Sequence, residues 1–303
     1  MTKLRLAPAL VLLCGLAWTQ DRAEELTPYS VTEVENLLHT FKQTYKNKNQ
    51  PEEDAVSVLG NMKQAYLYLM RQRVEGDEPI TKEEEKAAEK IVDMIAKRGL
   101  KVRNRPLVSL ECARVLGEIE AEDGAKDLGK WLEGVLDEKA PLPQHVEYGF
   151  LSLAWIGPDH SPSRDLVLKY ATTGKHNDIG VASQALRACY EWRELDGKDR
   201  KEFFEKILGY LGGLWSSMKG GEAKYRATYE QRYNAVKDHG LRALTELCTD
   251  GTKFTDPTAA QEWWNEHKKE KWDDYYGPRE RAKRGVEQKK ADEDGDKEPE
   301  AEG

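Results

Sequence analysis

The sequence of 303 residues lacks the short motifs of the common enzyme classes. It contains no Walker A loop, no GxGxxG, no GxSxG, no HExxH and no CxxC pair. Each of these motifs places a phosphate-binding loop, a nucleophile or a metal ligand at the spacing that its chemistry requires. The sequence therefore predicts a protein that is not an enzyme, with no catalytic residue, cofactor or metal site to assign.

Histidine is sparse, and its six residues are scattered along the chain. Glu262, Glu266 and His267 are spaced so that one helix would bring them together, as a weak metal site requires. Charge clusters on helices are more often solvent-exposed surface. We interpret this cluster as surface.

Long apolar runs are missing after residue 20, so no later segment is expected to cross a bilayer. One shorter run, LAPALVLLCGL at 6–16, follows Lys3 and Arg5. A basic start, a short apolar stretch and small residues are typical of a secretory signal peptide. We expect residues 1–20 to be a signal peptide, with an uncleaved anchor or a mis-started N-terminus as the alternatives. The mature chain is then periplasmic or secreted, without stable membrane insertion.

Cysteine is limited to four residues, and Cys14 lies within the apolar run, where lipidation is an alternative to simple cleavage. The mature chain keeps Cys112, Cys189 and Cys248, each beside apolar neighbours in an expected helix. An odd number does not complete a disulfide framework. We expect buried thiols instead.

Basic residues are outnumbered, since 47 Lys and Arg stand against 55 Asp and Glu, a formal net charge of −8. Nucleic-acid-binding domains usually present a basic patch or stripe. We therefore expect no nucleic-acid partner.

What the sequence does contain is a recurring helical pattern. Apolar faces with small central residues read VSLECARVLGEIE at 108–120, VEYGFLSLAWIGP at 146–158, GVASQALRACYEW at 180–192 and DHGLRALTELC at 238–248. Aligning the patterns gives spacings of 38, 34 and 58 residues. The first three are each followed by a turn and a second amphipathic helix. Paired helices that repeat at this period are typical of an α-solenoid.

Further helices are predicted at 33–46, 53–73 and 81–99, the last with a capping box formed by Thr81 and Glu84. The fourth repeat comes about twenty residues late. The extra segment, 212–233, is either an insertion or an extended helix pair.

The clearest repeat, ARVLGEIEAEDGAKDLGKWLEGVL, resembles a HEAT-type repeat. The matching positions are Ala113, Leu116, Gly117, Ile119, Asp123, Ala125, Leu128 and Leu132. The resemblance covers 107–212, extends more loosely over 31–106 and 236–270, and is absent from the tail. It implies an all-α, right-handed, ARM-like α-solenoid that binds proteins, of an exported bacterial type.

The domain organisation predicted is a signal peptide at 1–20, a HEAT-like α-solenoid at 21–276 and a disordered charged tail at 277–303. The tail has no apolar face to bury. Near the end of the solenoid, Asp256 and Pro257 predict a helix start. Trp263 and Trp264 in that helix point to sides too different for one neighbour to bury both, although a terminal cap is still their expected role.

A candidate partner-binding strip lies in the late segment. Tyr225, Tyr229 and Tyr233 recur at the helical spacing of four, interleaved with arginines. Tyrosine, tryptophan and arginine dominate interface hot spots. Packing of this helix onto the preceding unit is the alternative. The strip is assigned to Trp215, Tyr225, Arg226, Tyr229 and Arg232.

Together these features predict a non-catalytic scaffold of the cell envelope or secreted space, with a protein partner and an oligomeric state left open. Two alternatives remain. One is an α/α-toroid enzyme acting on glycans, and the other is a structural envelope component without a discrete ligand.

Overall fold

The structure is a computed structural model, and the predicted signal peptide (1–20) and charged tail (277–303) lie outside the residues that it describes. The described residues are 28–75, 80–102, 104–157, 160–172, 179–195, 197–248 and 251–272. Within these ranges the chain is helical and forms no strand, which confirms the predicted all-α class.

The described residues form eleven α-helices and two short helical segments of other types. The helices are α1 (Val31–Thr44), α2 (Glu52–Glu75), α3 (Lys82–Met94), α4 (Pro106–Glu118), α5 (Glu122–Leu136), α6 (Pro143–Trp155), α7 (Ser161–Thr172), α8 (Ile179–Ala188), α9 (Gly197–Gly220), α10 (Ala223–Leu247) and α11 (Pro257–His267). A π-helical turn, η1 (Ile95–Gly99), extends α3, and a 3-10 helix, η2 (Cys189–Glu194), extends α8. None of the helices in the described ranges is long and apolar enough to cross a membrane.

Local sequence signals set several of the helix starts. The predicted capping box is present, because Thr81 Oγ1 accepts from the Glu84 backbone N–H and the Glu84 carboxylate accepts from the Thr81 N–H. Asp256 caps α11 by accepting from two backbone N–H groups, with Pro257 at the first helical position. Both arrangements satisfy backbone donors that a helix start leaves without partners.

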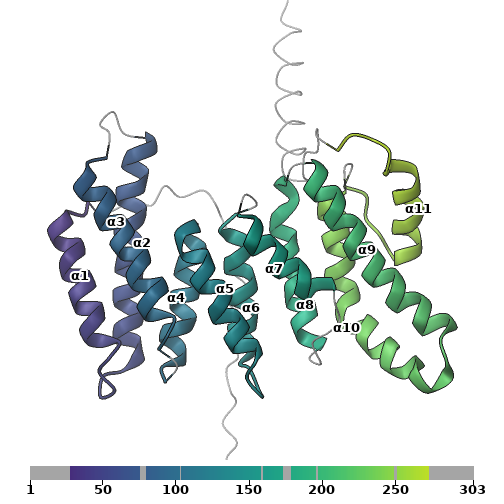
Figure 1. Ribbon diagram of the computed structural model, residues 1–303, viewed down its shortest axis with the longest axis horizontal. Helices are drawn as coiled ribbons and strands as arrows, with labels where there is room; N and C mark the ends of the chain where they lie inside the picture. Colours follow the sequence, from purple (N-terminus) through teal and green to yellow (C-terminus); the bar gives the residue numbers. More distant parts are fainter. Residues whose placement is uncertain are drawn as a thin grey trace, which may run out of the picture.

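The helices pack in two rows (Figure 1). Consecutive even-numbered helices contact one another from α2 to α10, and we call them the even row. The odd row consists of α3, α5, α7 and α9, which also contact in order. Helix α1 lies against α2 and α3, and α11 covers α9. Neighbours in space are therefore mostly neighbours in sequence.

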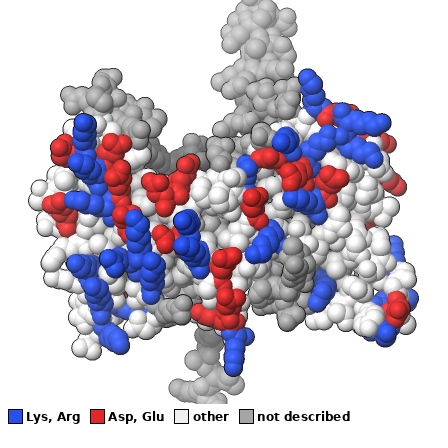
Figure 2. All heavy atoms as spheres, in the orientation of Figure 1, with Lys and Arg blue, Asp and Glu red and all other residues white. Residues whose placement is uncertain are grey.

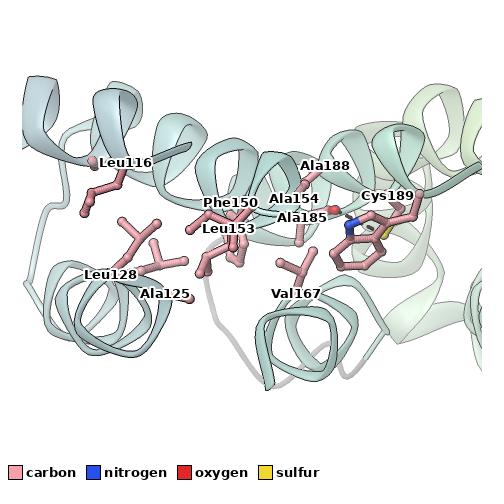
Figure 3. Packing of buried hydrophobic residues seen from close by; sticks show 14 of the residues in the cluster. Leu116, Ala125, Leu128, Phe150, Leu153, Ala154, Val167, Ala185, Ala188 and Cys189 are labelled. Carbon is pink, nitrogen blue, oxygen red and sulfur yellow. Dashed lines mark hydrogen bonds between the residues drawn. The ribbon is translucent and has the colours of Figure 1, made fainter. Parts of the chain in front are cut away.

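The apolar core fills the space between the two rows (Figure 3). Leu116 and Phe150 approach it from the even row, and Leu128 and Val167 from the odd row. The second amphipathic helix predicted for the clearest repeat is confirmed, since the leucines and the valine of 128–136 are buried and Trp131 is half-buried. Burial of such stripes is what stabilises amphipathic helices in proteins.

Glycine permits the close approach of helices from neighbouring pairs. A Cβ added at Gly117 of α4 would lie 2.6 Å from the Cα of Ser152 in α6 and 2.9 Å from the ring of Trp155. A Cβ at Gly149 of α6 would lie 2.6 Å from Leu132 of α5. These distances are far below ordinary carbon–carbon contact, so the crossing of α4 and α6 requires the absence of a side chain at Gly117.

The turn between α4 and α5 is a Schellman motif. Glu120 has a φ of 52°, its N–H donates to Gly117 O at 3.0 Å, and the Ala121 N–H donates to Leu116 O at 3.0 Å. This conformation usually selects glycine, because a Cβ is strained in the left-handed region. The turn therefore holds a non-glycine residue where glycine is favoured.

Two charged side chains hold the first helix pair against α4. Arg105 is 4% exposed, and its guanidinium donates to backbone carbonyls of the α1–α2 turn: Thr44, Asn47, Gln50 and Pro51. In the opposite direction, the Glu52 carboxylate accepts from the Leu107 and Val108 N–H groups at 2.8 and 3.2 Å. We call this arrangement the Arg105–Glu52 clamp.

The late segment at 212–233 proves to be an extended helix pair. Helix α9 has 24 residues and α10 has 25, and they pack against each other as a long hairpin. Their connection lies at the lower right edge of the molecule in Figure 1. Gly212 and Gly213 are inside α9 rather than in a loop.

The C-terminal helix closes the array with an aromatic cluster. The rings of Trp263 and Trp264 lie 5.2 and 5.4 Å from that of Phe204 in α9, and Trp272 and Phe254 complete the cluster. Trp263 is 8% exposed and Trp264 is 7% exposed. Phe204 contacts both rings and Trp272 adds a second shared neighbour, so the two tryptophans are buried by several side chains and not by one.

The three cysteines in the described residues are buried thiols, as predicted. Burial raises the pKa of the Cys189 thiol to about 12 and that of Cys112 well above its usual value. A thiol that resists ionisation is a poor nucleophile. These side chains therefore act as small apolar residues of the core.

Candidate partner-binding surface

The predicted strip lies at the far end of the α9–α10 hairpin. Tyr225 in the first turn of α10 is 50% exposed, and the Lys224 ammonium lies 4.6 Å from the centroid of its ring. Arg226 beside it is exposed as well. An exposed tyrosine flanked by cations offers a flat apolar face with a polar rim, which suits protein contact.

Trp215 belongs to the facing helix α9 and is half-buried. Its ring centroid lies 5.0 Å from that of Tyr233, and the Lys219 ammonium lies 4.0 Å above the ring. The tryptophan is therefore held in place by the hairpin itself while part of its ring stays accessible. A side chain that is already ordered loses little entropy on binding a partner.

Exposure decreases along the tyrosine series toward the body of the protein. Tyr225 is exposed, Tyr229 is half-buried against the core, and Tyr233 is 4% exposed. Arg232 is half-buried near Tyr210, whose pKa is raised by burial although the arginine opposes the shift. The packing alternative thus holds for Tyr233, whereas Tyr225 faces solvent.

Ion pairs connect neighbouring helices of the even row on the side away from the core, a feature that sequence periodicity did not predict. Lys63 of α2 contacts Glu118 of α4 at 2.9 Å. Arg187 of α8 forms an ion pair with Glu147 of α6. Partly exposed pairs of this kind contribute on the order of 0–1 kcal/mol, so they add little to the stability of the fold.

A part-buried hydrogen bond between two titratable groups joins η2 to α10. The Tyr190 hydroxyl bonds Nδ1 of His239 in α10, and the Arg242 guanidinium lies 4.7 Å from the Tyr190 ring centroid. Burial raises the pKa of Tyr190, which therefore stays protonated and donates this bond. Burial, followed by the charge of Arg187, lowers the pKa of His239.

The histidine of the cluster considered as a weak metal site is engaged in packing. His267 stacks on Trp263 with 4.2 Å between ring centroids, and its Nδ1 lies 2.8 Å from the Trp263 carbonyl oxygen, to which it must donate. Glu262 and Glu266 are exposed. The acidic side chains of this helix thus face solvent, while its histidine packs against a tryptophan.

Charges of both signs are distributed over the surface. Figure 2 shows basic and acidic side chains interspersed across the visible face, without a large field of one sign. Interspersed charges of opposite sign largely cancel at a distance, so this face generates no strong long-range field.

Comparison with known proteins does not assign the chain to a family. No protein-family model matches the chain, and no curated protein matches it. A crystal structure of an engineered protein, determined by a structural genomics consortium, matches with a TM-score of 0.34 and 16% identity over 71% of this chain and 96% of that chain. A likeness this low supports no inference about fold or function.

Proposed function

We propose that this protein is a non-catalytic scaffold that binds a protein partner in the cell envelope or the secreted space. In this proposal its helices form a right-handed α-solenoid of the HEAT-repeat, ARM-like type. The order of contacts within the even and odd rows supports the arrangement, because each hairpin of a solenoid contacts mainly its neighbours. The expected signal peptide supports the location.

The observation that carries the proposal is the exposure of Tyr225 at the end of a long, ordered hairpin. Large apolar side chains that are strongly exposed are few in the described residues, namely Leu107, Leu142 and Tyr225. Only the last of these is flanked by Lys224 and Arg226. Aromatic and arginine side chains together are what interface hot spots use.

Site-specific photocross-linking tests the contact. A photoreactive phenylalanine analogue at position 225 is expected to cross-link one discrete envelope or secreted protein in the native host. The same analogue at Leu107, which is 45% exposed and lies on α4 outside the strip, is the matched control. Equal cross-linking from the two positions, or none from position 225, would count against the strip.

Affinity measurement with the purified partner then tests the strip energetically. Tyr225→Ala combined with Arg226→Ala is expected to weaken binding at least tenfold, the effect of about 1.4 kcal/mol, which one hot-spot residue commonly exceeds. Leu107→Ala should leave the affinity unchanged. Both positions are exposed, so neither variant should lose stability.

Small-angle X-ray scattering separates the proposed solenoid from the α/α-toroid alternative. A stack of hairpins gives an elongated scattering profile, whereas a closed toroid of the same mass gives a nearly spherical one. A profile typical of a nearly spherical monomer would contradict the solenoid and favour the enzyme alternative.

A further inference from the structure

The end of the α9–α10 hairpin is positively charged, although the chain as a whole is negative. Residues 210–233 contain four cationic side chains against two carboxylates, a local net charge of +2, whereas the full chain carries −8. The cations are Lys219, Lys224, Arg226 and Arg232, and the carboxylates are Glu222 and Glu230. The strip lies within this end, so the local charge bears on the chemistry of the partner that the strip would bind.

Most of these cations have no acidic neighbour. Lys224 forms an ion pair with Glu222 at 3.1 Å, and both side chains are exposed. No carboxylate of the described residues lies within ion-pairing distance of Lys219, Arg226 or Arg232. An incoming anion can therefore bind these three cations without displacing an internal carboxylate.

Arg232 is the most informative of the three, because it is half-buried and still unpaired. No acceptor among the described residues bonds its guanidinium, and none of its nitrogen atoms is buried without a partner, so the group reaches solvent. Arginine is seldom withdrawn from water unless it is paired. A carboxylate from outside would supply the missing partner, and it matches the planar guanidinium with two parallel hydrogen bonds.

Two lysines are held over aromatic rings at this end of the hairpin. The Lys219 ammonium lies 4.0 Å from the centroid of the Trp215 ring, and the Lys224 ammonium lies 4.6 Å from that of Tyr225. A cation–π contact fixes an ammonium group while leaving N–H donors for an anion. A carboxylate would thus meet cations that are already ordered, which reduces the entropy lost on binding.

The length of the strip suits a short extended segment. Tyr225, Tyr229 and Arg232 follow one another at spacings of four and three, so they share one face of α10. At the rise of an α-helix this face is about 10 Å long. About three residues of an extended chain cover that distance, which is enough to place a carboxylate on either side of an apolar side chain.

An anionic membrane would meet the same charges, but this end lacks a matching apolar surface. Helices that lie in a membrane interface bury a broad apolar face among the headgroups. Within the described hairpin, Tyr225 is the only large apolar side chain that is strongly exposed, because Trp215 and Met218 are half-buried against the protein. The observations therefore favour an acidic protein segment.

We propose that the strip binds an acidic, extended segment of the protein partner. Carboxylates of the segment bind Arg226 and Arg232, and an apolar side chain between them lies against Tyr225. Lys219 provides a further cation nearby. This inference rests on the proposed function, because it specifies the chemistry of the partner for the same surface. Charge complementarity of this kind fixes specificity and accelerates association.

Two matched peptides test the requirement for negative charge. The full chain, labelled with ¹⁵N, is titrated with the peptide GEEDYDEEG and with its amide counterpart GQQNYNQQG, and binding is followed by NMR. The acidic peptide is expected to bind saturably, with shifts centred on 215–232, and about tenfold more tightly than the neutral one, the factor that one charge-assisted hydrogen bond provides. Its affinity should fall several-fold between about 50 and 300 mM salt, because exposed charges are screened. Equal affinities of the two peptides, or shifts confined to other helices, would overturn the proposal.

Matched charge variants test the location. Arg226→Gln combined with Arg232→Gln should weaken binding of the acidic peptide about tenfold. Lys82→Gln combined with Lys86→Gln removes the same charge from exposed positions of α3 and should leave the affinity unchanged. Thermal unfolding confirms that the variants are folded, and Arg226→Gln alone, at an exposed position, gives a smaller loss that tests the site if Arg232 is needed for folding. Equal losses in the two double variants would show that net charge alone attracts the peptide, which contradicts a site on the strip.

The outcomes separate this inference from the function on which it rests. A protein cross-linked from position 225, together with equal affinities of the two peptides, would keep the scaffold function and overturn the acidic segment. The absence of a cross-linked protein counts against the function itself. Displacement of the acidic peptide by phosphatidylglycerol vesicles would assign the cations to an anionic membrane. Residues 291–303 contain seven Asp and Glu and one Lys, so an internal cross-link from position 225 to them in the purified chain would replace the external partner by the chain's own end.

Discussion

Replacing Gly117 with alanine should separate α4 from α6. The new Cβ would lie 2.6 Å from the Ser152 Cα and 2.9 Å from the Trp155 ring. Carbon atoms prefer about 3.5–4.0 Å, so one helix must move by about 1 Å. The first of these contacts is with backbone, which a rotamer change cannot relieve.

The magnitude follows from two opposing terms. Overpacking of a well-packed core costs about 1–3 kcal/mol, and a rigid backbone contact places Gly117 at the upper end of that range. Replacing a glycine inside a helix with alanine stabilises the helix by at most about 1 kcal/mol, because alanine has the higher helix propensity. The net expected loss is about 2 kcal/mol in the free energy of unfolding.

Gly209 provides the matched control. It is exposed in the middle of α9, and an added Cβ would have no heavy atom within 4 Å. Only the higher helix propensity of alanine then matters, so Gly209→Ala should raise the free energy of unfolding by about 0.5–1 kcal/mol. The two variants thus differ by roughly 2.5–3 kcal/mol, although the chemical change is identical.

Urea unfolding followed by circular dichroism measures both variants. The midpoints should move in opposite directions, with little change in the slope of the transition. If Gly117→Ala proves as stable as Gly209→Ala, the reasoning about the α4–α6 crossing is refuted.

Three further outcomes follow from the described contacts. Leu132→Ala should lose about 2–5 kcal/mol in urea unfolding, because Leu132 is fully buried; a loss under about half a kcal/mol would place it on the surface. Glu120→Gly should raise the free energy of unfolding by about 1 kcal/mol, since φ is 52° there. A measured decrease would show that the Glu120 side chain itself stabilises the fold. The lowered pKa of His239 means that the unfolded chain binds more protons, so stability should fall as the pH drops through the ordinary value of 6.5 and level off below the folded value. His239→Gln should reduce that fall in unfolding measured between pH 7.5 and 5, and an unchanged pH profile would assign the loss to other groups.

The helices and their buried faces were predictable from periodicity, as α5 illustrates. Its apolar residues recur at the spacing of one helix face, and Leu128 and Leu132 are buried as that spacing requires. The Thr81 capping box is equally local. These features depend only on residues within one or two turns of each other.

Contacts between distant segments were not predictable in the same way. Nothing near Gly117 in the sequence points to Ser152, because their proximity depends on how two helices cross. The burial of Trp263 and Trp264 also depends on Phe204 and on the return of the chain to Trp272. Pattern analysis describes each helix face but does not identify what covers it.

The partner-binding strip was likewise predictable only in part. The spacing of Tyr225, Tyr229 and Tyr233 identified the strip, while their graded exposure depends on where α10 leaves the body of the protein.

The Arg105–Glu52 clamp has a consequence for how the protein opens. Both charges bind main-chain atoms, so the clamp depends on the backbone path of the α1–α2 turn and not on the identity of the side chains there. The clamp also joins segments 54–61 residues apart in sequence. The first hairpin and the start of α4 should consequently exchange their amide hydrogens as one cooperative unit rather than fray separately from the N-terminal end.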